Sequence, residues 1–133
     1  MRYPLDELID KTSIIKLKFE RIEKLEDRGI WANYLKEYSM AIGEYIGDGT
    51  CTAEQVEDWF ERLYEANATT WNLEADIRKG KDEELGLEKI GKLAIEIREN
   101  NSIRIMIKAE IVEVIGKGYK DFKENHISAK SNP

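Results

Sequence analysis

Apolar side chains recur at steps of three and four residues along most of this chain, which is the spacing of one face of an α-helix. In the first segment the repeating positions are Leu5, Leu8, Thr12, Ile15, Phe19 and Ile22. Pro4 suits the first turn of a helix, and Gly29 suits a C-terminal cap. The pattern therefore predicts a first helix from Pro4 to Arg28.

The same spacing continues after Gly29, at Trp31, Leu35, Tyr38, Ile42 and Tyr45. Gly47, Asp48 and Gly49 then interrupt it with residues that tolerate a positive φ. This interruption predicts that a second helix ends there and that a tight loop, residues 47–52, follows it.

A third helix is predicted from Thr52, because Thr52-Ala-Glu-Gln55 has the form of a capping box. Its apolar stripe contains Val56, Trp59, Leu63, Ala66, Thr70, Leu73 and Ile77. Gly80 is placed to end this helix, and residues 81–86 would reverse the chain.

The fourth predicted helix starts at Leu87 and contains a doubtful stretch at residues 100–102. Beyond it, isoleucines alternate at 103, 105 and 107 as they would in a strand. A helical stripe also fits, at Ile103, Ile107, Ile111, Val114 and Ile115. Helix is favoured, since a lone strand would leave its backbone groups unpaired. Gly116-Lys117-Gly118 is expected to end it.

Four helices with short connections predict an all-α fold, an antiparallel four-helix bundle with long helices. At 133 residues the chain fits one domain, predicted over residues 1–122. Residues 123–133 are polar and lack periodicity, so a mobile polar tail is expected there.

Charge and composition narrow the class of protein. The net charge is −6 and the pI is near 5.0, which argues against a nucleic-acid partner, because phosphate contacts need a dense basic surface. Residues 1–88 carry 12 basic and 21 acidic side chains, whereas residues 89–133 carry 9 and 6. No secretion signal or membrane-spanning run is visible, and a lone Cys51 cannot form an internal disulfide. A cytoplasmic protein with no membrane contact is expected.

Polar residues fall on helix faces that should be buried. In the fourth helix the apolar stripe is interrupted by Asn101, Arg104 and Lys108. In the third, a secondary face carries Asn67 and Glu74, and in the first, Asp10 and Arg21 flank the apolar stripe. If these faces meet, the charges must pair, because an unpaired buried charge costs several kcal/mol.

Three interpretations of these polar residues remain open. They form a buried ionic layer that fixes helix register, they hold a small anion such as a phosphate or carboxylate, or they are simply exposed. The candidate ligand-binding residues are Arg21, Asn67, Glu74, Asn101, Arg104 and Lys108.

Catalytic and metal motifs have little support. A helical nucleotide pyrophosphatase would need Glu-x-x-Glu on one helix and Glu-x-x-Asp on a later one to hold magnesium. Here Glu7-x-x-Asp10 precedes every Glu-x-x-Glu. The lone His126 has no nucleophile near it in sequence. The sequence therefore predicts no metal or cofactor, and it does not decide whether any reaction is catalysed.

Three segments resemble an uncharacterised family of small helical proteins from bacteria and their phages: ELIDKTSIIKLKFERI (residues 7–22), WNLEADIRKG (71–80) and IRENNSIRIMIKAEI (97–111). Members have an ELIDK-type first helix and, later, Asn, Arg and Lys at three- and four-residue steps, which match Asn101, Arg104 and Lys108. The resemblance implies a helical fold and a set of polar positions, and it implies no activity.

The expected function is a non-catalytic helical binding or assembly module that self-associates. Long helices with aromatic secondary faces leave apolar area that a four-helix monomer does not cover. The alternative is a small-anion binding protein or enzyme, with a polar site between the first, third and fourth helices.

Overall fold

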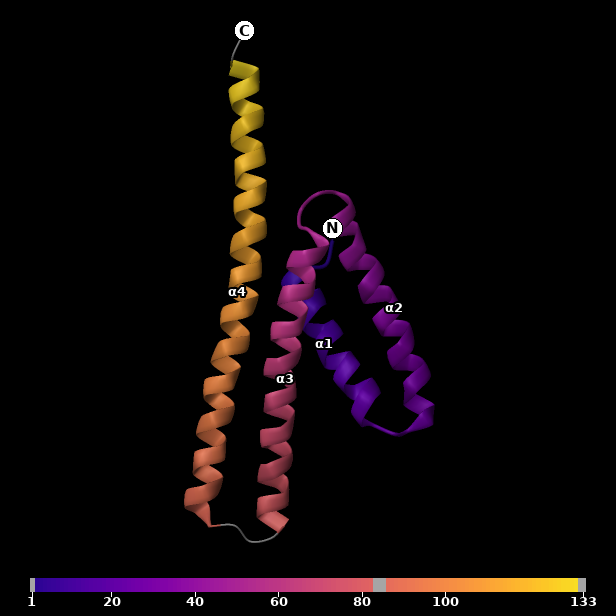
Figure 1. The fold of residues 1–133 in the computed structure, drawn as a ribbon, viewed down its shortest axis with the longest axis vertical. Helices are drawn as coiled ribbons and strands as arrows, with labels where there is room; N and C mark the ends of the chain where they lie inside the picture. The colour runs from indigo at the N-terminus through magenta and orange to yellow at the C-terminus, as the bar shows by residue number, and fades with distance from the viewer. Residues whose placement is uncertain (1, 83–85, 132–133) are drawn as a thin grey trace.

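The computed structural model contains four α-helices and, in the part of the chain that it describes, no strand (Figure 1). It describes residues 2–82 and 86–131, with side chains at 2–79 and 86–116. The helices are α1 (Leu5–Arg21), α2 (Leu25–Gly47), α3 (Ala53–Asp82) and α4 (Leu87–Ser131). The predicted all-α fold with long helices is confirmed.

The helix α1 lies at the centre of the arrangement and packs against each of the other three helices. The helices α3 and α4 lie side by side as a hairpin, whereas α2 packs chiefly on α1 (Figure 1). The C-terminal part of α4 extends well beyond the other helices. None of the helices, in the ranges described, is long and apolar enough to cross a membrane.

The apolar core joins all four helices near the start of α1. Its fully buried side chains include Leu5 and Ile9 of α1, Leu63 of α3 and Ile111 of α4. Each such side chain stabilises the fold by about 1.5–3 kcal/mol through apolar surface removed from water. These residues belong to, or lie beside, the apolar stripes that the sequence predicts.

The first helix is shorter than predicted. It ends at Arg21, because Ile22 has an extended backbone (φ −104°, ψ 122°), and Gly29 lies inside α2. A glycine costs a helix only about 1 kcal/mol, so it does not force an end. Reversal at residues 22–24 lets α2 fold back on α1, and places the guanidinium carbon of Arg28 4.2 Å from the centre of the Phe19 ring.

The start of α3 agrees with the prediction. The Thr52 amide donates to Gln55 Oε1 at 2.9 Å, and the Gln55 amide donates to Thr52 Oγ1 at 3.1 Å, so the capping box is present. In the loop before it, Gly49 has a φ of 83°, which favours glycine. At the other end α3 continues two residues past Gly80, to Asp82.

The helix α4 is continuous from Leu87 to Ser131. Residues 100–102 are helical, and the strand alternative is wrong. The predicted end at Gly116-Lys117-Gly118 is also wrong, because glycine weakens a helix without removing its backbone hydrogen bonds. The predicted mobility of the polar tail, residues 123–133, stays a prediction, and residues 132–133 lie outside the described part.

Candidate functional site

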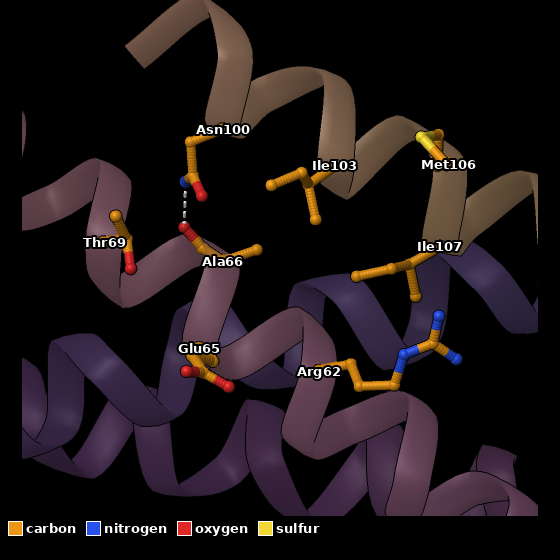
Figure 2. Close-up of a pocket in the computed structure, with 8 residues that line it drawn as sticks. All are labelled: Arg62, Glu65, Ala66, Thr69, Asn100, Ile103, Met106 and Ile107. Carbon is orange, nitrogen blue, oxygen red and sulfur yellow. Dashed lines mark hydrogen bonds between the residues drawn. The ribbon is translucent and has the colours of Figure 1, made fainter. Parts of the chain in front are cut away.

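A shallow groove runs between α3 and α4, with a volume of about 320 Å³ (Figure 2). Its lining residues are Arg62, Glu65, Ala66, Thr69, Asn100, Ile103, Met106 and Ile107. Across the groove Asn100 Nδ2 donates to the Ala66 carbonyl at 2.5 Å and to Thr70 Oγ1 at 2.7 Å. The groove is therefore closed at one end by a hydrogen-bonded amide and bordered by exposed apolar side chains of α4.

A second, more apolar groove of about 470 Å³ lies where α2 diverges from α3 over α1. Its floor includes Ile9, Ile42 and Phe60. Lys16 is at its edge, with its ammonium 5.2 Å from the centre of the Phe60 ring. Besides Lys16, its polar lining residues are Thr12, Ser39 and Glu57, and the rest of the lining is apolar or glycine, so the groove offers mainly apolar area.

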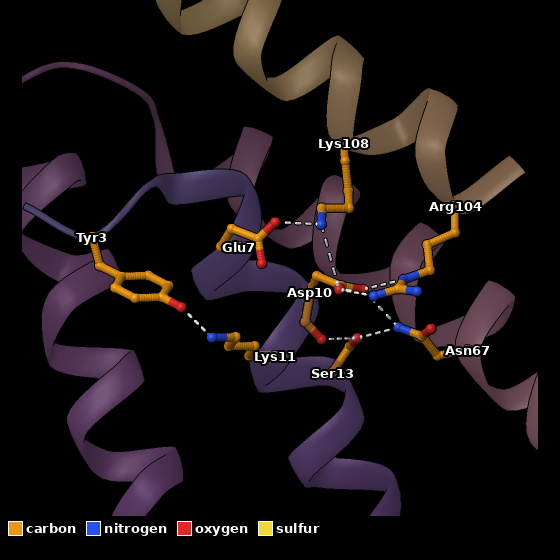
Figure 3. A network of polar contacts seen from close by, with 8 residues as sticks. All are labelled: Tyr3, Glu7, Asp10, Lys11, Ser13, Asn67, Arg104 and Lys108. Atoms are coloured by element: carbon orange, nitrogen blue, oxygen red, sulfur yellow. Dashed lines mark hydrogen bonds and ion pairs between the residues drawn. The ribbon is translucent and has the colours of Figure 1, made fainter. Parts of the chain in front are cut away.

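The most polar candidate is a buried network around Asp10 of α1 (Figure 3). The Asp10 side chain is only 2% exposed. Arg104 of α4 donates through Nε to Asp10 Oδ1 at 3.0 Å and through Nη2 to Oδ2. Asn67 of α3 donates to the same Oδ1 at 3.0 Å and to Ser13 Oγ at 2.8 Å. One carboxylate thus ties three helices together.

A second ion pair completes this network. Lys108 Nζ donates to Glu7 Oε1 at 2.5 Å and lies 3.9 Å from Asp10 Oδ2. We call the six residues the Asp10 network: Glu7, Asp10, Ser13, Asn67, Arg104 and Lys108. It contains two cations and two carboxylates, so its formal charge is balanced.

Helical spacing explains why these side chains meet. Residues three or four apart lie on the same helix face, as do Glu7 and Asp10 on α1 and Arg104 and Lys108 on α4. Burial alone would raise the pKa of Asp10, but the hydrogen bonds from Arg104 and Asn67 and the positive charges of Arg104 and Lys108 leave it below its ordinary value. The hydrogen bond to Asp10 likewise raises the pKa of Arg104.

Three of the six predicted site residues belong to the Asp10 network: Asn67, Arg104 and Lys108. The other three do not. Arg21 is at the far end of α1, where its Nη1 donates to Asn72 Oδ1 at 2.6 Å. Glu74 is exposed on α3, and Asn101 is exposed on α4.

The sequence analysis missed Glu7, Ser13 and Asn100. One residue rotates a helix by about 100°, so Asn100 and not Asn101 faces α3. In the sequence, Glu7 stands out only as the first residue of Glu7-x-x-Asp10, a spacing considered for magnesium. Glu7 is three residues from Asp10, and Lys108 is four residues from Arg104. These two spacings together indicate that Glu7 and Lys108 form a second ion pair.

The chemistry available in this network is limited. Every deeply buried polar side-chain atom of the described residues has a hydrogen-bond partner. Nor does the described part contain three His, Cys, Asp or Glu residues grouped to hold a metal. The charges of Arg104 and Lys108 are already balanced by Asp10 and Glu7, so the network offers an added anion no uncompensated positive charge.

In comparisons with known proteins, no protein-family model, no curated protein and no solved structure matches the chain. The resemblance to the uncharacterised bacterial and phage family therefore stays a prediction. Any functional argument has to come from the chain's own geometry.

Proposed function

We propose that this chain is a non-catalytic assembly module that self-associates through α4. The observation that carries the proposal is in residues 103–112 of α4, where seven of the ten side chains are apolar and lie on both the buried face and the outward face of the helix. Ile107 and Ile111 lie in the core, whereas Ile105 is 63% exposed and Met106 is 70% exposed. Apolar side chains on the outward face as well as on the buried face are typical of a helix that a partner covers.

Of the eleven exposed large apolar side chains in the described residues, six lie on α4 and four on α2. Five of the large apolar side chains of α4 between residues 95 and 112 are about half exposed or more: Ile95, Ile103, Ile105, Met106 and Val112. Single exposed apolar residues are ordinary on a protein surface, but a contiguous group of them marks an interaction site. A second copy of the chain always presents the same surface, which makes a symmetric dimer the simplest cover.

The Asp10 network supports this proposal because it fixes the position of α4 against α1 and α3. A buried, charge-balanced network fixes the register of the helices that it joins, because shifting α4 by one turn would separate Arg104 from Asp10. It therefore holds the apolar segment of α4 in a fixed orientation. Small-anion binding, the alternative, is disfavoured by the absence of an unpaired cation in the network.

Size-exclusion chromatography with light scattering tests the proposal. The parent should elute as a dimer, and Ile105→Lys should shift it to a monomer, since burying an unpaired ammonium at an interface costs several kcal/mol. Leu25→Lys is the matched control, because Leu25 is 85% exposed at the start of α2, away from α4. A monomeric parent, or equal loss in both variants, would refute the proposal.

A further inference from the structure

Resting on the self-association proposed above, we infer that two copies pair through α4 in an antiparallel arrangement, with the two-fold axis near residue 107. The occupant of the exposed face is a second α4. The argument depends on the spacing of the exposed residues, on their size and on the length of the helix.

Exposed positions of α4 repeat every seven residues. Residues 98, 105 and 112 form one series, and residues 95, 102, 109 and 116 form the other. We call these seven residues the α4 seam: Ile95, Arg98, Ser102, Ile105, Ala109, Val112 and Gly116. All are exposed, on the side of α4 away from the buried Ile111. Helices pack along one another through apolar residues at this spacing, and Ile95, Ile105, Ala109 and Val112 provide them here, with small Ser102 and Gly116 between or beside them.

Residue size distinguishes the two possible directions. In a parallel pair each residue meets its own copy, so Arg98 would face Arg98 and the small residues would face one another. In an antiparallel pair centred on residue 107, Ile105 lies opposite Ala109 and Val112 lies opposite Ser102. Arg98 then lies opposite Gly116. Within residues 98–116, each large side chain therefore meets a small one, and no like charges face each other.

The length of α4 agrees with this arrangement. Its 45 residues span about 68 Å at 1.5 Å per residue. A strip about 11 Å wide must run for about 70 Å to supply the roughly 800 Å² per partner of a specific interface. Only pairing along nearly the whole helix provides that area. The midpoint of α4 is Ala109, so antiparallel pairing around residue 107 overlaps residues 87–127. This overlap is about 62 Å long and gives about 680 Å² per partner, within the range of specific interfaces. It also gives the projecting C-terminal part a neighbour (Figure 1).

Disulfide trapping distinguishes the two directions. Ser102→Cys and Val112→Cys are made separately, and circular dichroism checks that each is helical. Around an axis at 107, each cysteine lies about 15 Å along the helix from its own copy, too far for a disulfide, which needs Cα atoms within about 7 Å. An equimolar mixture of the two variants places residue 102 opposite residue 112.

We expect the mixture to form covalent dimers under oxidation and each variant alone to stay uncrosslinked. Parent protein, whose Cys51 is buried, is the control for background crosslinking. Crosslinking of either variant alone would place that residue beside its own copy, as in a parallel pair, and would overturn the inference. A dimer in light scattering with no crosslink in the mixture would place the interface elsewhere and also overturn it. A monomeric parent would instead refute the proposed function.

Discussion

At the scale of single residues, the Asp10 carboxylate is the polar group that joins α1 to both α3 and α4. It is a charged group with almost no exposure, and its oxygens receive hydrogen bonds from α3 and α4. Removing Asp10 would leave Arg104 and Asn67 as partly or fully buried polar groups without their hydrogen-bond acceptor, which is costly.

Replacing Asp10 with alanine should therefore lower the free energy of unfolding by about 3–5 kcal/mol, the usual cost of breaking a buried pair by removing one partner. Chemical denaturation at one fixed protein concentration measures this. The control is Asp76→Ala, since Asp76 is exposed on α3 and a surface carboxylate contributes about 0–1 kcal/mol. Equal effects of the two substitutions would contradict the role given to Asp10.

Stability should also depend on pH through Asp10. Its pKa in the folded protein is lowered from the usual 3.8, so the folded state favours the charged form more than the unfolded state does. The resulting stability is present above the unfolded pKa and is lost as pH falls through the lower, folded pKa.

Acidification from about pH 5 to about pH 3 should accordingly lower the free energy of unfolding more in the parent than in Asp10→Asn. Other carboxylates contribute equally to both proteins, so the difference between the two curves isolates Asp10. Urea denaturation across this pH range gives the result. Parallel curves would mean that the hydrogen bonds to Asp10 do not favour its charged form.

At the scale of elements, the sequence predicts the existence of each helix better than its ends. Apolar spacing is repeated over many residues, whereas an end depends on one or two. Gly29, Gly80 and Gly116 were each expected to end a helix, and each lies within one. Tertiary packing outweighs the small cost of glycine, whereas Thr52 and Gln55 set the start of α3 through hydrogen bonds that the sequence itself specifies.

The pairing of α3 with α4 provides a test of helix rotation. Asn100→Ala should lower the free energy of unfolding by about 1–3 kcal/mol, because it removes the donor to the Ala66 carbonyl and to Thr70. Its neighbour provides the control: Asn101→Ala, at an exposed position, should change stability by less than about 0.5 kcal/mol. A larger effect at Asn101 would mean that α4 is rotated from the orientation described.

At the scale of the whole molecule, sequence spacing predicts that polar side chains of α1, α3 and α4 meet, but not which ones. Arg104, Lys108 and Asn67 were found because they interrupt or flank apolar stripes. Arg21 and Glu74 are also charged residues beside apolar stripes, yet they lie farther along α1 and α3 than the point where the helices cross. Where helices cross is decided by the whole core, which local spacing does not encode.

The exposed face of α4 is likewise visible only once the helices are placed. In sequence, Ile103, Ile105, Met106 and Ile107 are apolar residues around a single arginine, and nothing local separates the core residue Ile107 from its exposed neighbours. Arg104 and Lys108 of α4 pair with Asp10 and Glu7 of α1, and these ion pairs fix the orientation of α4. Once α4 is oriented, Ile107 faces the core and its apolar neighbours face outward.

Sedimentation equilibrium of the parent chain over a wide range of concentrations tests the central claim most directly. Self-association through α4 predicts a mass that rises to twice the 15.5 kDa of one chain and stays there. A mass of one chain at every concentration would contradict it.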